Sequence, residues 1–239
     1  VYDPATDTYT AGPSHGEGFD AFAGAALAPT GKVVFAPWDS ANVGVYDPAT
    51  DTYTSGPSHG EGTNTFMGAA LAPTGEIVFA PYSSANVGVY DPATDTYTAG
   101  PSHGEGTYAF WGAALAPTGK VVFAPFGSTN VGVYDRATDT YTAGPSHGEG
   151  TNAFMGAALA PTGEVVFAPH RSANVGVYDP ATDTYTSGPS HGEGSGAFAG
   201  AVLAPTGEVL FAPDSSINVG VYDPATDTYT AGPSHGEGT

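Results

Sequence analysis

The sequence predicts an all-β fold, a five-bladed β-propeller of four-stranded antiparallel blades, and three observations support this prediction. A stretch of two apolar segments around a Pro-Thr-Gly turn begins at Phe22 and returns every 44 residues. A fixed period near this length is typical of propellers and repeat arrays. Strand-like segments alternate with turn residues, and no segment has helical periodicity. Four short strands in each repeat are the pattern of a propeller blade. The stretch begins at Phe22, Phe66, Phe110, Phe154 and Phe198.

A second motif, Val-Tyr-Asp-Pro-Ala-Thr-Asp-Thr-Tyr, opens the chain and recurs with little change, giving six copies. The first motif occurs only five times, so the chain is a half-unit followed by five whole units. We expect a single propeller domain over residues 1–239. Its expected parts are the half-unit 1–20 and the units 21–64, 65–108, 109–152, 153–196 and 197–239.

The first whole unit contains four predicted strands. Residues 22–28 are rich in Gly and Ala, which lets neighbouring strands approach closely, so this strand is expected at the axis. Residues 33–36 are β-branched or apolar, as strands prefer. Residues 43–46 and the polar residues 52–54 complete the unit, the last strand lying at the rim. The chain's 35 glycines and 21 prolines fall between such segments, so they predict turns rather than disorder.

The net charge is −20, with only four lysines and arginines. Binding a phosphate backbone requires cations that displace counterions, so we expect no nucleic-acid partner. The same argument applies to anionic membrane surfaces, and no apolar run approaches the ~18 residues of a membrane span. The absence of cysteine excludes disulfides and thiolate metal sites and leaves the compartment open.

The surplus half-unit creates a closure problem. Residues 1–18 and 221–238 are copies of the same half, and either one could complete the blade that begins at Phe198. One copy is then left over, and unpaired strand edges recruit partners. We therefore expect the spare half to pack on the rim or to mediate self-association. The chain also opens at Val1 in mid-repeat without a Met, which suggests a fragment or a processed product.

The stretch Val45-Tyr46-Asp47-Pro48-Ala49-Thr50-Asp51-Thr52-Tyr53 resembles the third and fourth strands of a kelch repeat. Two departures from the kelch pattern stand out: Ala36-Pro37 replaces the usual Gly-Gly, and Tyr53 replaces the usual Trp. A five-bladed ring of short repeats is also similar in plan to the tachylectin family, whose members bind amino sugars. That second likeness is architectural, and a fold alone does not transfer function.

Differences between the repeats concentrate in two places: the lead-in to the first strand and the loop after the second strand. In a four-stranded meander both places lie at the same end of the blade, so the variation should fall on one face around the axis. Loops on a rigid scaffold often carry binding residues, and aromatic faces suit sugar rings or methylated ammonium groups. The alternative is drift at loosely constrained loop positions. The candidate ligand-binding residues are Trp38, Tyr82, Tyr108, Trp111, Phe126 and His170.

A His-Gly-Glu motif recurs in every copy of the half-unit and is expected to ring the same face. His and Glu can bind a divalent cation, so His59, Glu61, His103 and Glu105 are weak metal candidates. One His and one Glu per blade make a poor four-ligand site. The alternative is a Gly-flanked turn whose side chains satisfy local backbone groups. We therefore expect no cofactor, a divalent cation remaining the one exception.

Three functions remain open. The first is a non-enzymatic, lectin-like binding module that recognises a carbohydrate or another small ligand on the variable face. The second is a recently amplified or engineered symmetric scaffold with no dedicated ligand, which the near-identity of the repeats favours. The third is a glycoside hydrolase, which needs two carboxylates in distinct environments. The carboxylates unique to one repeat are Asp20, Asp39 and Asp214, and the expectation is that the protein is not an enzyme.

Overall fold

The computed structural model describes residues 1–236 and contains 22 strands in six antiparallel sheets. Five sheets have four strands each, and the sixth is a two-stranded sheet formed by β1 (Tyr2–Asp3) and β2 (Thr8–Tyr9). Within the described residues there is no helix of the length and apolarity that a membrane span requires. An all-β fold of repeated four-stranded antiparallel sheets, as expected, is therefore confirmed.

The five four-stranded sheets, called blades 1 to 5, have the same order of strands from the axis outwards. Blade 1 comprises β3 (Phe22–Leu27), β4 (Val33–Pro37), β5 (Asn42–Asp47) and β6 (Thr52–Ser58). Blade 2 comprises β7 (Phe66–Leu71), β8 (Ile77–Pro81), β9 (Asn86–Asp91) and β10 (Thr96–Ser102). Blade 3 comprises β11 (Phe110–Leu115), β12 (Val121–Pro125), β13 (Asn130–Asp135) and β14 (Thr140–Ser146). Blade 4 comprises β15 (Phe154–Leu159), β16 (Val165–Pro169), β17 (Asn174–Asp179) and β18 (Thr184–Ser190). Blade 5 comprises β19 (Phe198–Leu203), β20 (Val209–Pro213), β21 (Asn218–Asp223) and β22 (Thr228–Ser234).

The four predicted strands of the first unit are all present, and the outermost strand is longer than expected. Strand β6 continues to Ser58 through a register shift, with Asn42 opposite Ser58 and Gly44 opposite Ser55. Pro57 is tolerated in this strand because β6 is an edge strand, where a missing N–H breaks no ladder. The predicted turns also form: Gly31 and Asp51 have φ angles of 81° and 52°, which Gly and Asp adopt more readily than most residues.

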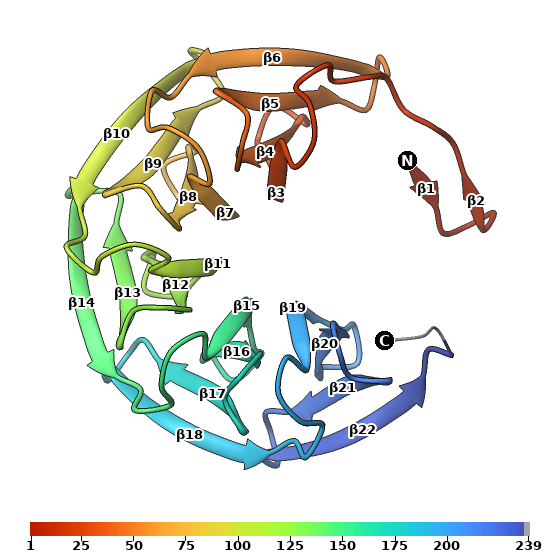
Figure 1. The fold of residues 1–239 in the computed structure, drawn as a ribbon, viewed down its shortest axis with the longest axis vertical. Helices are drawn as coiled ribbons and strands as arrows, with labels where there is room; N and C mark the ends of the chain where they lie inside the picture. Colours follow the sequence, from red (N-terminus) through yellow and green to blue (C-terminus); the bar gives the residue numbers. More distant parts are fainter. Residues whose placement is uncertain (237–239) are drawn as a thin grey trace.

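Close backbone contact between inner strands sets the spacing of the blades. A β-carbon added to Gly68 in β7 would lie 2.6 Å from the carbonyl oxygen of Trp111 in β11. Gly112 is in the same position against Met155 of blade 4, also at 2.6 Å. Only glycine permits this approach, which explains the small residues of the predicted inner strand. The prediction that this strand lies at the axis is correct (Figure 1).

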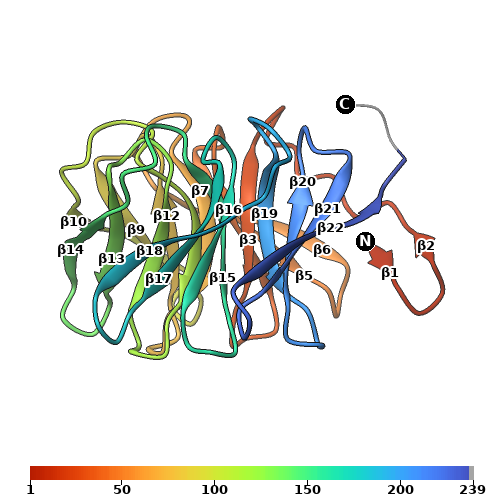
Figure 2. The same cartoon turned by 90° about the horizontal axis from the view of Figure 1, so that it is seen from below.

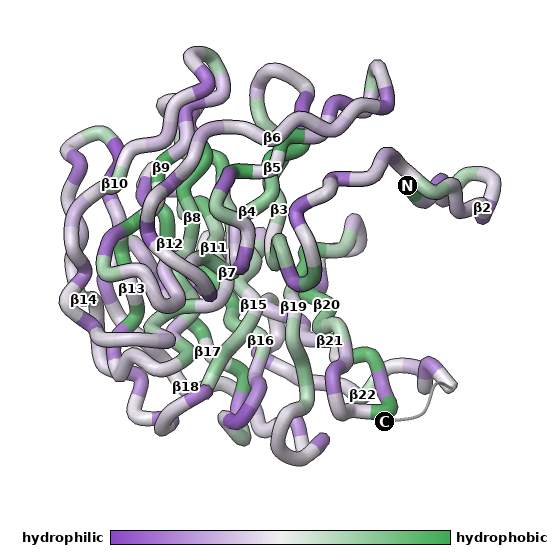
Figure 3. The backbone as a smooth tube through the Cα atoms, turned by 45° about the horizontal axis from the view of Figure 1, so that its top comes forward, coloured by the Kyte–Doolittle hydropathy of each residue, from purple (hydrophilic) through white to green (hydrophobic). Residues whose placement is uncertain are grey.

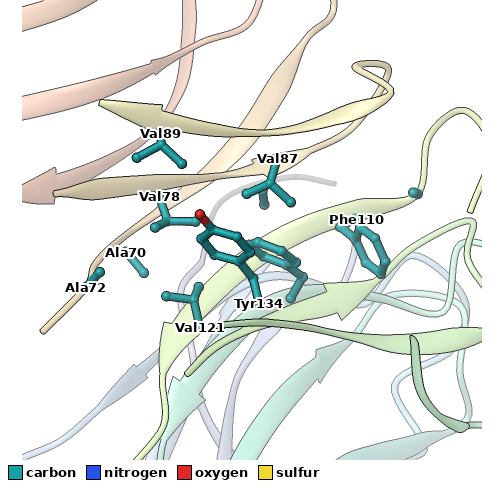
Figure 4. Close-up of a cluster of buried hydrophobic side chains, with 11 residues drawn as sticks. Ala70, Ala72, Val78, Val87, Val89, Phe110, Val121 and Tyr134 are labelled. Atoms are coloured by element: carbon teal, nitrogen blue, oxygen red, sulfur yellow. The ribbon is translucent and has the colours of Figure 1, made fainter. Parts of the chain in front are cut away.

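The core consists of four equivalent clusters, one between each pair of neighbouring blades. In the cluster between blades 2 and 3, small and β-branched residues of β7, β8 and β9 pack against larger residues of β11, β12 and β13 (Figure 4). The larger residues include Phe110, Phe123 and Tyr134, which are fully buried. Hydrophobic residues therefore gather in the inner strands, while most loops and turns are white to purple in Figure 3. Each blade is stabilised through its neighbours rather than within itself.

The expected closed ring of five blades is wrong. Viewed down the axis, the five blades follow an open arc, and the two-stranded sheet lies at the opening between blade 1 and blade 5 (Figure 1). Seen from the side, β1 and β2 stand away from the stacked blades (Figure 2). The structure thus has six sheets, and the blade that begins at Phe198 is completed by its own strands β21 and β22. The inter-blade spacing set by the glycine contacts leaves the arc open after five blades.

Candidate ligand-binding face

A chain of backbone hydrogen bonds builds the face on which the repeats differ. The residue after the second strand of each blade donates its N–H to its own blade, as Tyr82 does to the carbonyl of Thr65 at 2.9 Å. The carbonyl of Tyr82 accepts the N–H of Ala109 in the next blade at 3.0 Å. Phe126 and His170 repeat this arrangement in blades 3 and 4. The two variable segments therefore lie together at one end of the blades, as expected, and we call this end the loop face.

Five of the six candidate residues meet on the loop face, and we call them the aromatic arc: Tyr82, Tyr108, Trp111, Phe126 and His170. Tyr82 contacts three of the other rings. Its ring centroid lies 4.9 Å from the centroid of Tyr108, 5.4 Å from that of Trp111 and 5.9 Å from that of Phe126. Trp111 and Phe126 are 5.0 Å apart, and Phe126 is 5.9 Å from His170. The Tyr82–Trp111 pair is edge-to-face, an arrangement that aromatic quadrupoles favour.

Tyr108 has a backbone conformation that tyrosine rarely adopts. Its φ is 60°, in the left-handed region. The equivalent residues are Asp20, Asn64, Asn152 and Gly196, which also have positive φ but are the types that tolerate it. A bulky residue at this position costs about 1–2 kcal/mol of backbone strain. Such strain persists where the surroundings fix it, and it is a reason to look for a function.

The aromatic arc is partly exposed. Phe126 is only 7% exposed and forms the base of the arc, whereas Tyr108 is 52% exposed and presents its ring to solvent. Burial, followed by charge repulsion from Tyr108, raises the pKa of Tyr82. At the far end, His170 Nε2 lies 3.6 Å from a carboxylate oxygen of Asp214. The arc therefore combines an apolar ring surface with polar groups at its margin.

Trp38, the sixth candidate, occupies the equivalent position in blade 1 but makes no ring contact with the aromatic arc among the described residues. Its indole Nε1 is buried without a hydrogen-bond partner among the described residues. Next to it, Asp39 accepts the N–H of Asn64 at 3.1 Å. Trp38 therefore belongs to the loop face without joining the cluster.

The His-Gly-Glu motif links consecutive blades. His103 Nδ1 accepts the N–H of Glu105 at 3.2 Å, so Nε2 carries the proton and donates to the carbonyl of Ser84 at 2.8 Å. The Glu105 carboxylate accepts hydrogen bonds from Ser128 at 2.8 Å and Tyr141 at 3.3 Å, both in blade 3. One motif thus binds blade 2 through its His and blade 3 through its Glu. The expectation of a turn whose side chains satisfy local groups describes this geometry, although the sequence did not indicate the link between blades.

The four weak metal candidates all take part in hydrogen bonds of this kind. His59 repeats the two ring bonds of His103, to the carbonyl of Ser40 and the N–H of Glu61. The Glu61 carboxylate accepts from Ser84 at 3.0 Å and from Tyr97 at 3.4 Å. In the part of the chain that the structure describes, no group of three or more His, Asp or Glu side chains is placed to hold a metal ion. The structure thus places these residues in structural hydrogen bonds.

No family model matches the chain, including any for the kelch-like repeat, and no curated protein sequence matches it. Several solved structures do match the chain. Virginiamycin B lyase from Staphylococcus aureus has a TM-score of 0.73 at 13% identity, over 88% of this chain and 69% of that chain. A streptogramin B lyase structure has a TM-score of 0.74 at 15% identity, over 90% and 70%. A fungal alcohol oxidase of the AA5 family, solved with copper, has 0.74 at 16%, over 98% and 58%.

These structural neighbours are propeller proteins, so the chain has a propeller-type fold. At 13% to 16% identity, the likeness shows the fold alone. The lyase and oxidase activities in their descriptions belong to those proteins. A propeller supports many unrelated functions, so the function of this chain has to be argued from its own loop face.

Proposed function

We propose that this protein is a non-enzymatic ligand-binding propeller whose aromatic arc binds a carbohydrate in a lectin-like manner. The observation that carries the proposal is Tyr108, a tyrosine that is 52% exposed, held in a left-handed conformation, with its ring tilted against that of Tyr82. The backbone strain at Tyr108 does not stabilise the repeat fold. Tyrosine and tryptophan rings offer a flat apolar surface to the C–H face of a sugar ring, and polar groups beside them select hydroxyl orientations.

The composition of the aromatic arc agrees with recognition rather than catalysis. Its only neighbouring carboxylate contact among the described residues is Asp214, which faces His170 at 3.6 Å. Hydrolysis of a glycoside would need a second carboxylate at a defined distance from the first. The proposed ligand is therefore bound unchanged, with no cofactor. A quaternary or methylated ammonium group is the other chemistry that suits exposed aromatic rings.

The test is a thermal-shift screen of the whole chain against simple sugars, amino sugars, a methylated ammonium compound and divalent cations. Binding to the folded state raises the Tm according to ligand concentration and Kd. A sugar that raises the Tm of the wild type and not that of Tyr108→Asn supports the proposal. Asn is the residue at the equivalent positions 64 and 152, so this variant keeps the backbone conformation.

Two results would overturn the proposal. If no compound raises the Tm, the symmetric scaffold becomes the better account and the aromatic arc is packing. If a glycoside of the bound sugar is hydrolysed during incubation, as measured by release of reducing ends, the glycoside hydrolase alternative replaces it. Tyr108→Phe, which keeps the ring, is the matched control and should respond as the wild type does.

A further inference from the structure

The opening in the arc exposes two surfaces that are buried between every other pair of blades. In blade 2, Phe66 and Phe79 are fully buried against blade 1. Their counterparts in blade 1, Phe22 and Phe35, are only partly buried because no other four-stranded blade of the described residues packs against them. This side of blade 1 is therefore an unoccupied half of an inter-blade interface.

Blade 5 exposes the complementary half. Val202 is 60% exposed, whereas Ala158, its counterpart in blade 4, is 7% exposed. Ala212 is likewise exposed, while the equivalent Ala168 is fully buried. The inner strand shows the same difference, because the β-carbon site of Gly200 meets no neighbouring blade and the nearest atom is Ala212 Cβ at 3.5 Å. The two uncovered surfaces correspond to the two sides of a blade.

An apolar cavity of about 570 Å³ lies against the uncovered side of blade 1. It is lined by Phe22, Phe35 and Tyr46 from the blade and by Val1 and His15 from the half-unit. In the complete interfaces, the equivalent Phe and Tyr residues contact Ala and Val side chains of the preceding blade's three inner strands. The cavity therefore corresponds to the space that those small side chains fill in the complete interfaces.

The two-stranded sheet already has the structure of the outer half of a blade. Tyr2 pairs with Tyr9, and its hydroxyl donates to Asp7 at 2.9 Å, as Tyr90 does to Asp95 at 2.9 Å in blade 2. The half-unit also contacts blade 1 through its His and Glu, as the other copies contact the blade that follows them. His15 contacts Phe22 with ring centroids 5.7 Å apart, and the Glu17 carboxylate accepts from Ser40 at 3.0 Å. What is missing at this position is the inner pair of strands.

We propose that this opening is a binding site for a β-hairpin of the repeat's own inner-strand type, such as residues 151–173. The Ala and Val side of that hairpin would cover Phe22 and Phe35. Its Phe154, Val165 and Phe167 side would cover Val202 and its neighbours in blade 5. The four complete interfaces of the protein show both contacts, so the occupant is identified by the interfaces already present.

The register of the bound hairpin follows from the complete blades. In blade 4, Val165 lies opposite Tyr178 and Val166 opposite Val177. Tyr178 and Val177 correspond to Tyr2 and Val1 in the half-unit. The hairpin therefore pairs with the free edge of β1, and the exposed edge of that strand becomes an internal strand of a four-stranded sheet.

A second copy of the chain is the competing occupant. Its five inner hairpins are already paired within complete blades, so it has none to donate without unfolding. A second copy could only pack its uncovered blade 1 or blade 5 surface against the uncovered surface of the first copy. Such a head-to-tail contact does not close and would produce oligomers that grow with concentration.

The test is a titration of the full chain with a fluorescently labelled synthetic peptide of residues 151–173, followed by anisotropy and by amide hydrogen exchange. We expect saturable 1:1 binding, a higher Tm, and slower exchange in residues 1–10. The matched control peptide carries Phe154→Asp and Phe167→Asp and should bind at least tenfold more weakly, because charges would enter the apolar interface. Equal binding of the two peptides would overturn the proposal.

Two variants of the protein locate the site. Val202→Arg, on the uncovered side of blade 5, should weaken peptide binding at least tenfold. Thr206→Arg, in the exposed turn that joins β19 to β20, should leave it unchanged. Unchanged binding to Val202→Arg would contradict the proposed position. Light scattering gives the remaining outcome: oligomers that form without peptide and exclude it would show that a second copy covers these surfaces.

A covalent form avoids any insolubility of the free peptide. Residues 152–173 are appended directly after Thr239, which has the repeat position of Thr151, and the Tm is compared with that of an extension carrying the two Phe→Asp changes. A rise in Tm of several degrees for the first extension alone is expected, since it would form two further interfaces. No difference between the two extensions would overturn the proposal.

Discussion

Gly127 and Tyr108 form the shortest of the equivalent backbone hydrogen bonds in the five blades. The N–H of Gly127 donates to the carbonyl of Tyr108 at 2.8 Å, and a β-carbon on Gly127 would lie 2.6 Å from that oxygen. In blade 2 the corresponding bond, from Ser83 to Asn64, is 3.2 Å long. The tyrosine in its left-handed conformation is thus accommodated by a glycine that only this repeat carries at this position.

This pairing predicts that the two positions are energetically coupled. Gly127→Ser alone should lower the free energy of unfolding by about 1–3 kcal/mol, because the added atoms overlap the Tyr108 carbonyl. In the Tyr108→Asn background the same change recreates the pair found in blade 2 and should cost at least about 1 kcal/mol less. A double-mutant cycle by urea unfolding measures the difference. Equal costs in the two backgrounds would show that the contact is not specific.

The inter-blade links predict a large effect of His103→Ala and a small one of His15→Ala. The His103 ring is 6% exposed, forms two hydrogen bonds and lies 5.6 Å from Phe110. Its removal should lower the free energy of unfolding by about 3 kcal/mol. His15, in the same motif, is exposed and, among the described residues, lacks the Nε2 bond that His103 forms, so the loss should stay below about 1 kcal/mol. Similar losses at both positions would contradict the role assigned to the motif.

Charges at the junctions between blades predict a stabilising substitution. Glu76 of blade 2 forms an ion pair with Arg136 of blade 3 at 2.9 Å. Glu164 takes the corresponding turn position in blade 4, but it faces Tyr222, whose hydroxyl donates to Asp227. Two other repeats have lysine at this turn position. Glu164→Lys should therefore raise the free energy of unfolding by about 0.2–1 kcal/mol at low salt, with the gain lost in 1 M NaCl. A lower Tm at low salt would contradict this reading.

Two partly buried tyrosines predict loss of stability at alkaline pH. Burial, followed by the charge of Glu61, raises the pKa of Tyr97, and Tyr141 beside Glu105 is raised in the same way. The folded state therefore holds these protons after the unfolded chain, with a tyrosine pKa of about 10, releases them. The stabilisation is complete below about pH 10 and is lost as pH rises through the higher folded-state values. Each such tyrosine contributes a slope of at most about 1.4 kcal/mol per pH unit.

Urea unfolding at several pH values between 8 and 12 measures this slope. Tyr97→Phe, which removes one titrating group, should flatten the decline above pH 10. Tyr9→Phe is the control, because Tyr9 is 77% exposed. A decline of the same steepness in the wild type and both variants would show that the partly buried tyrosines are not its cause.

The sequence predicted the strands well and the closure of the ring poorly, for a physical reason. Strand positions depend on local residue types, such as the Pro-Thr-Gly turn after β3, and these are visible in a single repeat. The number of blades in a closed ring depends on the angle between them. That angle is set by contacts such as Gly68 against Trp111, which involve two repeats at once.

The loop face was predicted in part for a similar reason. Variation between copies indicated the residues of the aromatic arc, because residues that repeat symmetry does not dictate stand out in such a chain. The contacts of Tyr82 with three other rings, the positive φ of Tyr108 and the isolation of Trp38 depend on the paths of the loops. Variation alone carries no information on those paths.

Calorimetric titration of two single-tryptophan variants tests the proposed binding face most directly. The ligand is the sugar that gives the largest thermal shift with the wild type. Trp111 lies in the aromatic arc and Trp38 outside it, so the two tryptophans of the chain form a matched pair. Trp38→Phe should bind with the Kd of the wild type, and Trp111→Ala should bind at least tenfold more weakly. The opposite pattern, or equal affinity in both variants, would contradict the assignment of the aromatic arc as the binding site.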